Sequence, residues 1–366
     1  MGVYLALFLI IIMTYPVIKY NKNLYLIINS ICIFIVMALR NSSVGADTIS
    51  YKNFFESTNL QNLPSNFINW LAPLHDQRFE TGFMLYNKIL YSINPNFQYE
   101  LIITSLLIIT CYVFFLVRLE VNYFWGFLTY LSLGFFANSM NLLRQSIAWA
   151  LLLVAFVYCI EKKPFKFLLF VMLAAGMHVT AWLFLVVYPL SFMNINIKNV
   201  SLILGSSFII TFIFEKLYGF VSNYSTEASS FSEDIISNQL NGGVNLAINI
   251  LLFTLIFLIG VSICLNKTLR LNDKTIRIVK TSLYMLIFAI AVSIVSFKFS
   301  QLYRIAMYFA TGEIILIPFI IENIRNYRLK RIISGIVTIG LVAYFIVIQV
   351  LRPEWSNIVP YHWFNY

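Results

Sequence analysis

Long runs of apolar residues alternate with short polar segments along nearly the whole chain. A run of about 20 apolar residues has the length of a helix that crosses the hydrocarbon core of a membrane. The pattern therefore predicts about twelve transmembrane helices. They lie near residues 2–18, 24–39, 99–117, 122–138, 141–160, 165–177, 180–193, 199–214, 244–265, 279–297, 303–321 and 331–350.

The composition indicates what kind of protein these runs build. Of the 366 residues, 60% are hydrophobic and 11% are charged, and the mean hydropathy is +0.82. A soluble domain carries about 25% charged residues and could not bury this much apolar surface. The apolar segments are continuous rather than alternating, which favours helices over membrane strands. We therefore predict an all-α polytopic membrane protein in which residues 1–366 form a single transmembrane domain.

The net charge of +10 bears on the orientation of the chain. In a soluble protein it would suggest a nucleic-acid partner, but in a membrane protein it indicates Lys and Arg in cytoplasmic loops. If the N-terminus faces outward, most Lys and Arg residues fall in inward loops and most carboxylates in outward ones. The opposite orientation violates the positive-inside rule. We predict that both termini are extracytoplasmic and expect no nucleic-acid partner.

Two long segments then lie outside the membrane. The first, residues 40–98, contains aromatic anchors at Trp70 and Tyr91 and a half-apolar stretch at 80–93. That stretch is too short and too polar to cross a bilayer, so it is expected to form an interfacial or re-entrant helix. The second segment, 215–243, is polar and Ser-rich and is expected to be a mobile extracytoplasmic loop.

With this topology the unusual polar residues gather at one side of the membrane. They lie at outer helix ends or in the first outer loop and are Arg40, Asp47, Tyr51, Arg78, Glu80, Asn141, Arg144, Gln145, His178 and Arg304. Polar groups at this density in an oily chain are costly unless they face a partner or a wet cavity. We therefore predict that they form the mouth of an outward-facing active site.

One group of these residues shares a predicted helix face. Asn141, Arg144, Gln145 and Ala148 are spaced as i, i+3, i+4 and i+7. The functional interpretation is a guanidinium presented to an anion, with amides beside it. The alternative is that Arg144 extends to the outer headgroups. The amides on the same face favour the functional interpretation.

Three residues could accept a proton. His178, at a membrane boundary, could be a general base or bind a sugar hydroxyl or phosphate, or it could be an ordinary interfacial histidine. Asp47 follows Gly45, which permits a sharp turn, and could be a catalytic carboxylate or the N-cap of a short helix. Glu80 opens the interfacial helix and is equally open, because a carboxylate in a first turn is favoured by the helix dipole.

The arginines suggest an anionic ligand. Arg304 and Tyr308 lie one turn apart at the outer end of a helix, although tyrosine is also common at membrane interfaces. Arginine matches phosphate bidentately and stays charged. The sequence contains no Walker, zinc, nucleophile-elbow or Gly-rich nucleotide motif, which argues against an ATP-driven or nucleotide-sugar enzyme, and we predict no cofactor. A metal could serve instead of arginine, but the carboxylates are too scattered in the sequence to predict one. Glu313 lies deeper in an apolar helix, where an ionisable group is a functional candidate.

Several short motifs occur in an order that resembles the EpsG family of Wzy-like polysaccharide polymerases. They are R-x4-G-x-D-T-x-x-Y (40–51), E-x-G-F (80–83), N-x-x-R-Q-x-x-A (141–148), H-x-T-A (178–181) and R-x-x-x-Y (304–308). The resemblance covers about residues 35–310. It implies a C-type-glycosyltransferase-like enzyme of the bacterial cytoplasmic membrane. Such an enzyme would join undecaprenyl-diphosphate-linked oligosaccharide units at the outer face, making O-antigen, capsule or exopolysaccharide without nucleotide sugars.

The resemblance also implies roles and partners. Arg144 and Arg304, with Arg40, would bind the diphosphate, and His178, Asp47 or Glu80 would activate the acceptor hydroxyl. Besides the lipid-linked donor and acceptor, membrane lipids, a chain-length regulator and a flippase of the same pathway are expected partners. Two other functions predict features of their own. A flippase or transporter predicts related halves, and a membrane O-acyltransferase predicts a histidine reachable from the cytoplasmic side; neither feature is found.

Overall fold

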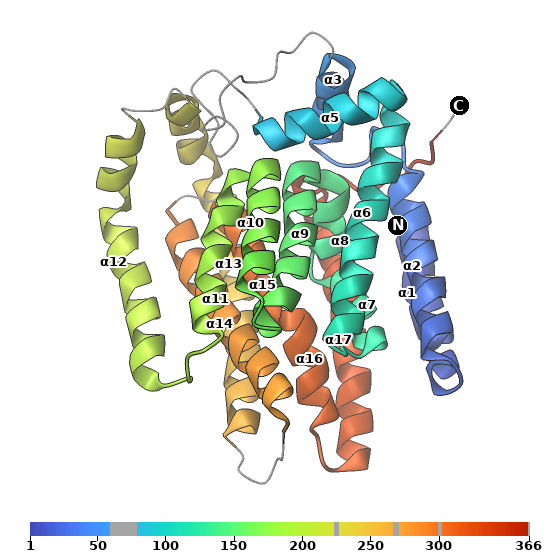
Figure 1. Ribbon diagram of the computed structural model, residues 1–366, viewed down its shortest axis with the longest axis vertical. Coiled ribbons are helices and arrows are strands. Elements are labelled where there is room, and N and C mark those ends of the chain that lie inside the picture. The colour runs from blue at the N-terminus through green and yellow to red at the C-terminus, as the bar shows by residue number, and fades with distance from the viewer. Residues whose placement is uncertain (59–78, 223–226, 266–270, 299–301, 365–366) are drawn as a thin grey trace. The chain divides into compact units, whose positions relative to one another are not determined.

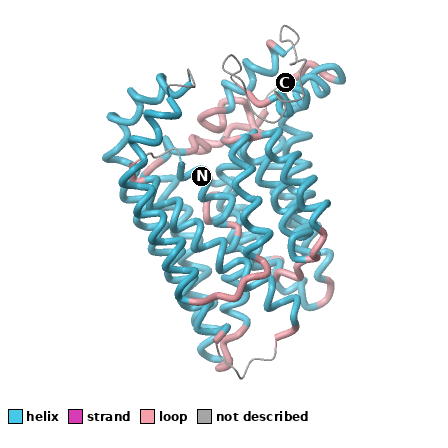
Figure 2. The backbone as a smooth tube through the Cα atoms, turned by 60° about the vertical axis from the view of Figure 1, so that its left-hand side comes forward, coloured by secondary structure: helices cyan, strands magenta, loops and turns pink. Residues whose placement is uncertain are grey.

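The structure is a computed structural model that describes residues 1–58, 79–222, 227–265, 271–298 and 302–364. Every regular element among these residues is a helix, as the tube in Figure 2 makes visible. The one exception is an isolated bridge between Arg40 and Trp363. The prediction of an all-α protein is confirmed.

The chain divides into two compact units. Unit 1 comprises residues 1–73, 78–182 and 324–366, and unit 2 comprises residues 74–77 and 183–323. The helices of unit 1 are α1 (Gly2–Met13), η1 (Tyr15–Lys19), α2 (Lys22–Ala38), α3 (Thr48–Glu56), α5 (Thr81–Ile93), α6 (Phe97–Arg118), α7 (Tyr123–Ser132), α8 (Phe135–Asn141), α9 (Leu143–Ile160), α10 (Pro164–Met177), α17 (Tyr327–Leu351) and η5 (Pro353–Trp355). Helix α9 is the best buried candidate span, because α6 and α10 pack against it.

Unit 2 is built around one long helix. Its elements are α11 (Val187–Leu190), α12 (Ile197–Ser222), α13 (Glu227–Cys264), α14 (Asp273–Ser296), α15 (Tyr303–Ala310) and α16 (Gly312–Glu322), and η3 (Val179–Val186) connects the two units. Helix α14 contacts each of the other five α-helices. Glu313, in the first turn of α16, is 2% exposed.

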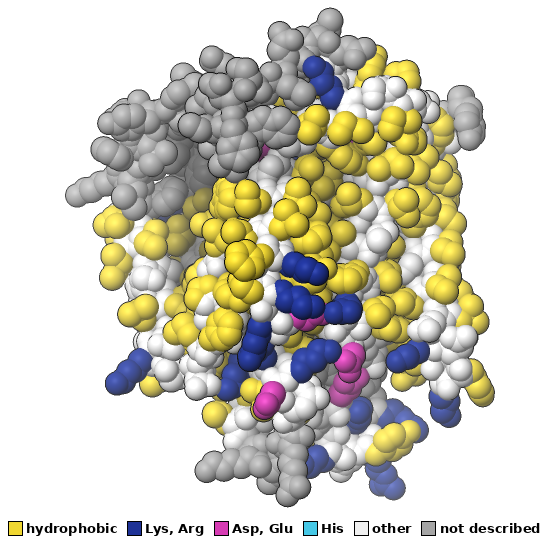
Figure 3. Space-filling view, in the orientation of Figure 1, with side chains coloured by type: hydrophobic (Ala, Val, Ile, Leu, Met, Phe, Trp, Pro, Cys, Tyr) yellow, Lys and Arg dark blue, Asp and Glu magenta, His cyan; other side chains and the backbone are white. Residues whose placement is uncertain are grey.

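The long helices have the length and composition of membrane spans. Within the described residues, six segments satisfy both criteria, and the bent pair α15 and α16 would make a seventh. Large hydrophobic side chains lie exposed on their outer surfaces, for example Leu9, Leu106 and Ile339. Figure 3 shows how widely such side chains cover the visible face. The protein is therefore an integral membrane protein, and the larger number of about twelve spans stays a prediction.

Several of the predicted long helices are interrupted. The run at 122–138 becomes α7 and α8, because Gly134 between them adopts φ 86, a left-handed conformation that breaks a helix. The run at 180–193 is largely 3-10 helix. The run at 303–321 bends by 41° between α15 and α16. Apolar periodicity locates a helix well but does not reveal where its axis turns.

Most of the segment 215–243, predicted to be an extracytoplasmic loop, is helical, and its place outside the membrane stays a prediction. Helix α12 continues to Ser222 and α13 begins at Glu227. The segment contains no proline, so its polar composition does not prevent the two helices from extending.

Two short helices occupy the described part of the first predicted outer loop. Helix α5 covers the stretch expected to be interfacial and lies across the ends of α9 and α10 rather than along them (Figure 1). It buries Phe83, Met84 and Leu90 on one face. The expected anchor Trp70 and the predicted site residue Arg78 lie outside the described residues.

Candidate functional site

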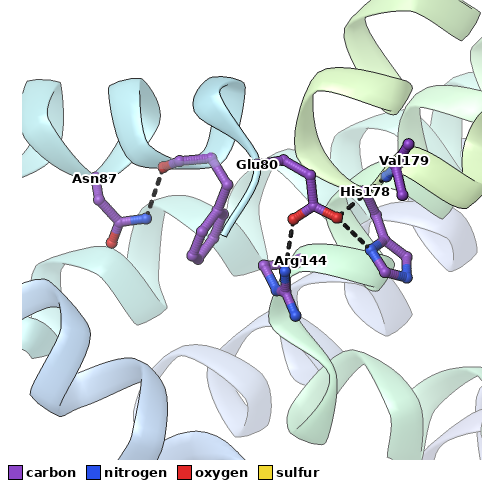
Figure 4. A network of polar contacts seen from close by, with 6 residues as sticks. Glu80, Asn87, Arg144, His178 and Val179 are labelled. Carbon is purple, nitrogen blue, oxygen red and sulfur yellow. Dashed lines mark hydrogen bonds and ion pairs between the residues drawn. The ribbon is translucent and has the colours of Figure 1, made fainter. Parts of the chain in front are cut away.

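Three helix ends of unit 1 meet at one point, and each contributes an ionisable side chain (Figure 4). Glu80 is the N-cap residue of α5, and Arg144 lies in the first turn of α9. His178 is the C-cap of α10, where the chain leaves the helix with extended backbone angles. These residues are separated by 64 and 98 positions in the sequence. All three were predicted site residues, and the fold brings them together.

The Glu80 carboxylate is the centre of the cluster. Its Oε2 accepts a hydrogen bond from Arg144 Nη1 at 2.5 Å. Its Oε1 lies 2.8 Å from His178 Nδ1 and also accepts from the backbone N–H of Val179 at 3.1 Å. Both oxygens are therefore occupied by partners from other elements, and Glu80 makes no capping hydrogen bond to its own helix.

The environment keeps Glu80 ionised. Burial, with a side chain only 6% exposed, would by itself raise its pKa. The hydrogen bond from His178 and the charge of Arg144 outweigh burial and lower the pKa to about 2. A carboxylate can only accept, so His178 must carry its proton on Nδ1. In the neutral imidazole the other ring nitrogen, Nε2, is then the proton acceptor, and the His178 side chain is 20% exposed.

Arg144 is held by more than Glu80. Its guanidinium lies over the ring of Phe79, 4.5 Å from the centroid, and Tyr51 is a further electrostatic neighbour. The side chain is 21% exposed. These contacts disfavour the alternative in which Arg144 reaches for the headgroups. They also mean that Arg144 is already paired with a carboxylate inside the protein.

The chain was compared with known proteins. The family model described as the EpsG family matches residues 23–363. The chain belongs to the EpsG family. Membership indicates a polysaccharide-polymerase type of function with glycosyltransferase-like activity. Neither the curated proteins nor the solved structures compared with this EpsG-family protein include a match.

Only three of the four residues predicted to share a helix face at 141–148 lie on one helix in this EpsG-family protein: Arg144, Gln145 and Ala148. Helix α8 ends at Asn141, Leu142 breaks the chain direction with φ −97 and ψ 69, and α9 begins at Leu143. Asn141 therefore does not share a continuous helix with Arg144 and Gln145. Gln145 is 7% exposed. The predicted grouping of Asn141 with Arg144 was wrong because the helix begins at Leu143, two residues later than predicted.

Asn141 instead ties three segments together. Its Oδ1 accepts from the backbone N–H of Asp47 at 2.8 Å, and its Nδ2 donates to the carbonyl of Trp355 at 3.5 Å. The turn before Asp47 depends on Gly45, which has φ +106. An added Cβ there would clash with the backbone carbonyl oxygen of Met140 and the hydroxyl oxygen of Thr48. Asn141 thus fixes the turn that leads into α3, and with it the position of Tyr51.

Asp47 occupies the N-cap position of α3, but its side chain does not act as a cap, because it makes no capping hydrogen bond. Its backbone N–H, rather than its carboxylate, makes the contact with Asn141. The capping prediction was therefore wrong. The catalytic alternative for Asp47 stays a prediction.

Replacing Asn141 by alanine is expected to destabilise unit 1. The change leaves the Asp47 N–H without its acceptor in a site where residue 141 is 4% exposed, a cost of about 1–3 kcal/mol. Thermal unfolding in detergent, followed by loss of soluble protein, measures the effect. Asn53→Ala, on the exposed side of α3, is the matched control. Equal melting temperatures for the two variants would contradict the assigned role.

Arg40 does not lie at an open mouth as expected. It is 1% exposed, and its Nη1 donates to the carbonyl of Met37. Burial lowers its pKa to about 10 against the opposing influence of Tyr361, Tyr4 and Glu100. A guanidinium enclosed in this way does not reach a substrate diphosphate. This burial disfavours Arg40 as a ligand of the diphosphate and indicates a structural role.

The C-terminal segment encloses this region and was not anticipated from the sequence. Backbone hydrogen bonds join Asn41 to His362, Gly45 to Asn357, Ala46 to Ser356 and Phe364 to Leu39. The Tyr4 hydroxyl donates to Ile358 at 2.6 Å and draws in the start of α1. Most of these bonds are made by backbone atoms, so no residue pattern could have revealed them.

The remaining predicted residues belong to unit 2. Arg304 is exposed at the start of α15, whereas Tyr308, one turn later, is 1% exposed. Tyr308 is therefore a packed side chain within unit 2. Across the described part of the chain, no group of three or more His, Cys, Asp or Glu residues could hold a metal ion.

Proposed function

We propose that the protein polymerises polysaccharide from undecaprenyl-diphosphate-linked oligosaccharide units at the outer face of the bacterial cytoplasmic membrane. The observation that carries the proposal is the hydrogen bond between Glu80 and His178 Nδ1, beside Arg144, in a member of the EpsG family. A carboxylate that orients a histidine is an arrangement for proton abstraction.

His178 is the proposed general base. The pKa of Glu80 near 2 makes that carboxylate a weak proton acceptor at neutral pH, so it is poorly suited to the task itself. Its contribution is to hold the tautomer of His178 that leaves Nε2 free of a proton, and to orient the ring. This assigns different roles to two residues that the sequence left equivalent.

The proposed reaction is a glycosyl transfer. The acceptor hydroxyl gives its proton to His178 Nε2 as its oxygen forms a bond to the anomeric carbon of the donor. The bond from that carbon to the lipid diphosphate breaks, and the diphosphate leaves with the electron pair. The proton on His178 then passes to solvent or to the leaving group. Each cycle lengthens the glycan by one repeat unit and releases one lipid diphosphate.

Positive charge favours the departing diphosphate. Arg144 contributes to the potential near His178, although Glu80 compensates part of its charge. The assignment of Arg304, which is exposed on α15, to diphosphate binding stays a prediction from the sequence. The proposed enzyme resembles the C-type glycosyltransferases. Its proposed protein partners are a chain-length regulator and a flippase of the same pathway.

The geometry of unit 1 supports an outward-facing site. Arg144 lies in the first turn of α9, whereas Glu161 follows the end of α9 and pairs with Arg118 and Lys163. With 18 residues, α9 separates these ends by about 27 Å, close to the thickness of the hydrocarbon core. A basic cluster is expected on the cytoplasmic side, which leaves Arg144 and His178 on the outer side.

A gel of surface polysaccharide tests the proposed step. A deletion strain is complemented with wild-type protein or with Arg144→Ala, and accumulation of each protein is verified by immunoblot. We expect deletion to reduce a ladder of chain lengths to one repeat unit, and Arg144→Ala to accumulate without restoring the ladder. Persistence of the ladder in the deletion strain would contradict polymerisation.

Other phenotypes identify the other candidate functions. Disappearance of single repeat units from the surface would indicate a flippase. Polymer of normal length that lacks acyl groups would indicate an O-acyltransferase. Either result would remove polymerisation as the function.

A further inference from the structure

Helices α5 and α10 approach each other so closely that their backbones touch. An ideal Cβ built on Gly82 would lie 2.7 Å from the carbonyl carbon of Gly176 and 2.9 Å from its Cα, and closer still to its carbonyl oxygen. The obstructing atoms are backbone, which cannot move aside as a flexible side chain would. Any residue other than glycine at position 82 must therefore push the two helices apart.

This contact lies next to the proposed catalytic pair on both helices. Gly82 is two residues after Glu80, and Gly176 is two residues before His178. The Glu80 carboxylate reaches both the ring of His178 and the backbone N–H of Val179, at 2.8 Å and 3.1 Å. Two simultaneous hydrogen bonds to one oxygen require a well-defined separation of the two helix ends. The backbone contact between the glycines provides it.

We propose that Gly82 is a positioning residue that sets the distance between Glu80 and His178. The proposal rests on the proposed function for its effect on polymerisation, but not for its effect on the histidine. Substitution at Gly82 should lengthen the bond between Glu80 and His178 and release the ring from its fixed tautomer. A displacement of about 1 Å at such a site can lower a rate by about 100-fold.

The contact is asymmetric, which supplies a matched control. A Cβ on Gly176 would meet the Cα of Gly82 at 3.7 Å, an ordinary van der Waals distance. Gly82→Ala and Gly176→Ala add the same methyl group to opposite sides of one contact. Alanine has a higher helix propensity than glycine at both positions, so a difference between the two variants would not come from helix propensity. We expect only Gly82→Ala to disturb the pair.

The tautomer of His178 is the direct readout. The chain has three histidines, so the double variant His75→Gln, His362→Gln leaves His178 as the single histidine for nitrogen-15 NMR of the labelled, full-length protein in nanodiscs. In this background we expect the signal of an Nδ1-protonated ring, retained in Gly176→Ala and lost or averaged in Gly82→Ala. An unchanged signal in Gly82→Ala would overturn the proposal.

Gly176→Val provides a second route if Gly82→Ala fails to accumulate. The branched carbons of valine reach further toward Gly82 than a single methyl, so the same change of the His178 signal is expected. An unchanged signal in Gly176→Val would overturn the proposal in that case.

The surface polysaccharide gel separates this inference from the proposed function. We expect Gly82→Ala to reduce polymer by about 100-fold and Gly176→Ala to retain most of it. A disturbed tautomer with a normal ladder would refute His178 as the base while leaving Gly82 as the residue that positions it. In Gly82→Ala, a normal His178 tautomer together with loss of the ladder would refute only the positioning role of Gly82.

Discussion

His178→Ala is expected to lower polymer formation by about 10²- to 10⁴-fold while the protein still accumulates in the membrane. The substitution removes the proposed proton acceptor, Nε2. It leaves the ion pair between Glu80 and Arg144 in place at 2.5 Å, so unit 1 keeps that link between α5 and α9. Purified protein in nanodiscs, supplied with the lipid-linked repeat unit of its host, gives the rate directly.

His362→Ala is the matched control for this experiment. His362 is exposed, and the contact that it makes with Asn41 uses its backbone carbonyl, which alanine retains. We expect polymer formation close to that of the wild type. Normal polymerisation by His178→Ala would show that the proton is taken elsewhere, with Asp47 as the next residue to test.

Glu80→Gln is expected to have an effect of similar size, about 10²- to 10⁴-fold, for a different reason. All three partners of Glu80 are donors: Arg144 Nη1, the N–H of Val179 and the protonated Nδ1 of His178. An amide has one oxygen and one NH2 group, so the NH2 must face a donor in either orientation. It either breaks the ion pair or forces His178 to protonate Nε2, which removes the base.

The tautomer signal and the polymerisation rate together test this account of Glu80. We expect Glu80→Gln to lose both, whereas Glu56→Gln, in an exposed pair with Lys52 on α3, should keep both. A Glu80→Gln protein that polymerises normally would mean that Glu80 only joins the helices.

Glu80 also makes stability depend on pH. Its pKa falls from the ordinary value of 4.5 to about 2 in the folded protein, so it stabilises the fold above about pH 4.5. That contribution, about 3 kcal/mol, is lost as the pH falls from about 4.5 toward 2. Glu80→Gln should be less stable than wild type at pH 6, and the difference should shrink at pH 3. A difference that grows on acidification would contradict the assigned pKa.

The helices of this protein follow from its apolar runs. Each predicted run contains helix in the structure, because a backbone in an oily environment must satisfy its own hydrogen bonds. Their interruptions depend on local features that periodicity does not report. Gly134 ends α7 through a left-handed conformation, and Leu142 separates α8 from α9. The predicted face that grouped Asn141 with Arg144 failed at that second break.

The candidate site was predictable as single residues but not as an arrangement. Glu80, Arg144 and His178 attract attention because ionisable groups are costly near apolar helices. Arg40 attracts attention for the same reason, yet it is enclosed beside the C-terminal segment and does not open to a substrate. Exposure depends on which segments pack over a residue, and the sequence around Arg40 does not contain that information.

The sequence by itself determined that this is a helical membrane protein of the EpsG type with a few ionisable residues at helix ends, because hydropathy and residue type act locally. Only the tertiary structure decided that Glu80 binds both Arg144 and His178, because those contacts join residues 64 and 98 positions apart. It also decided that Gly82 meets the backbone of Gly176. The sequence shows that residue 82 lacks a side chain, whereas only the fold shows that the backbone of Gly176 lies where that side chain would be.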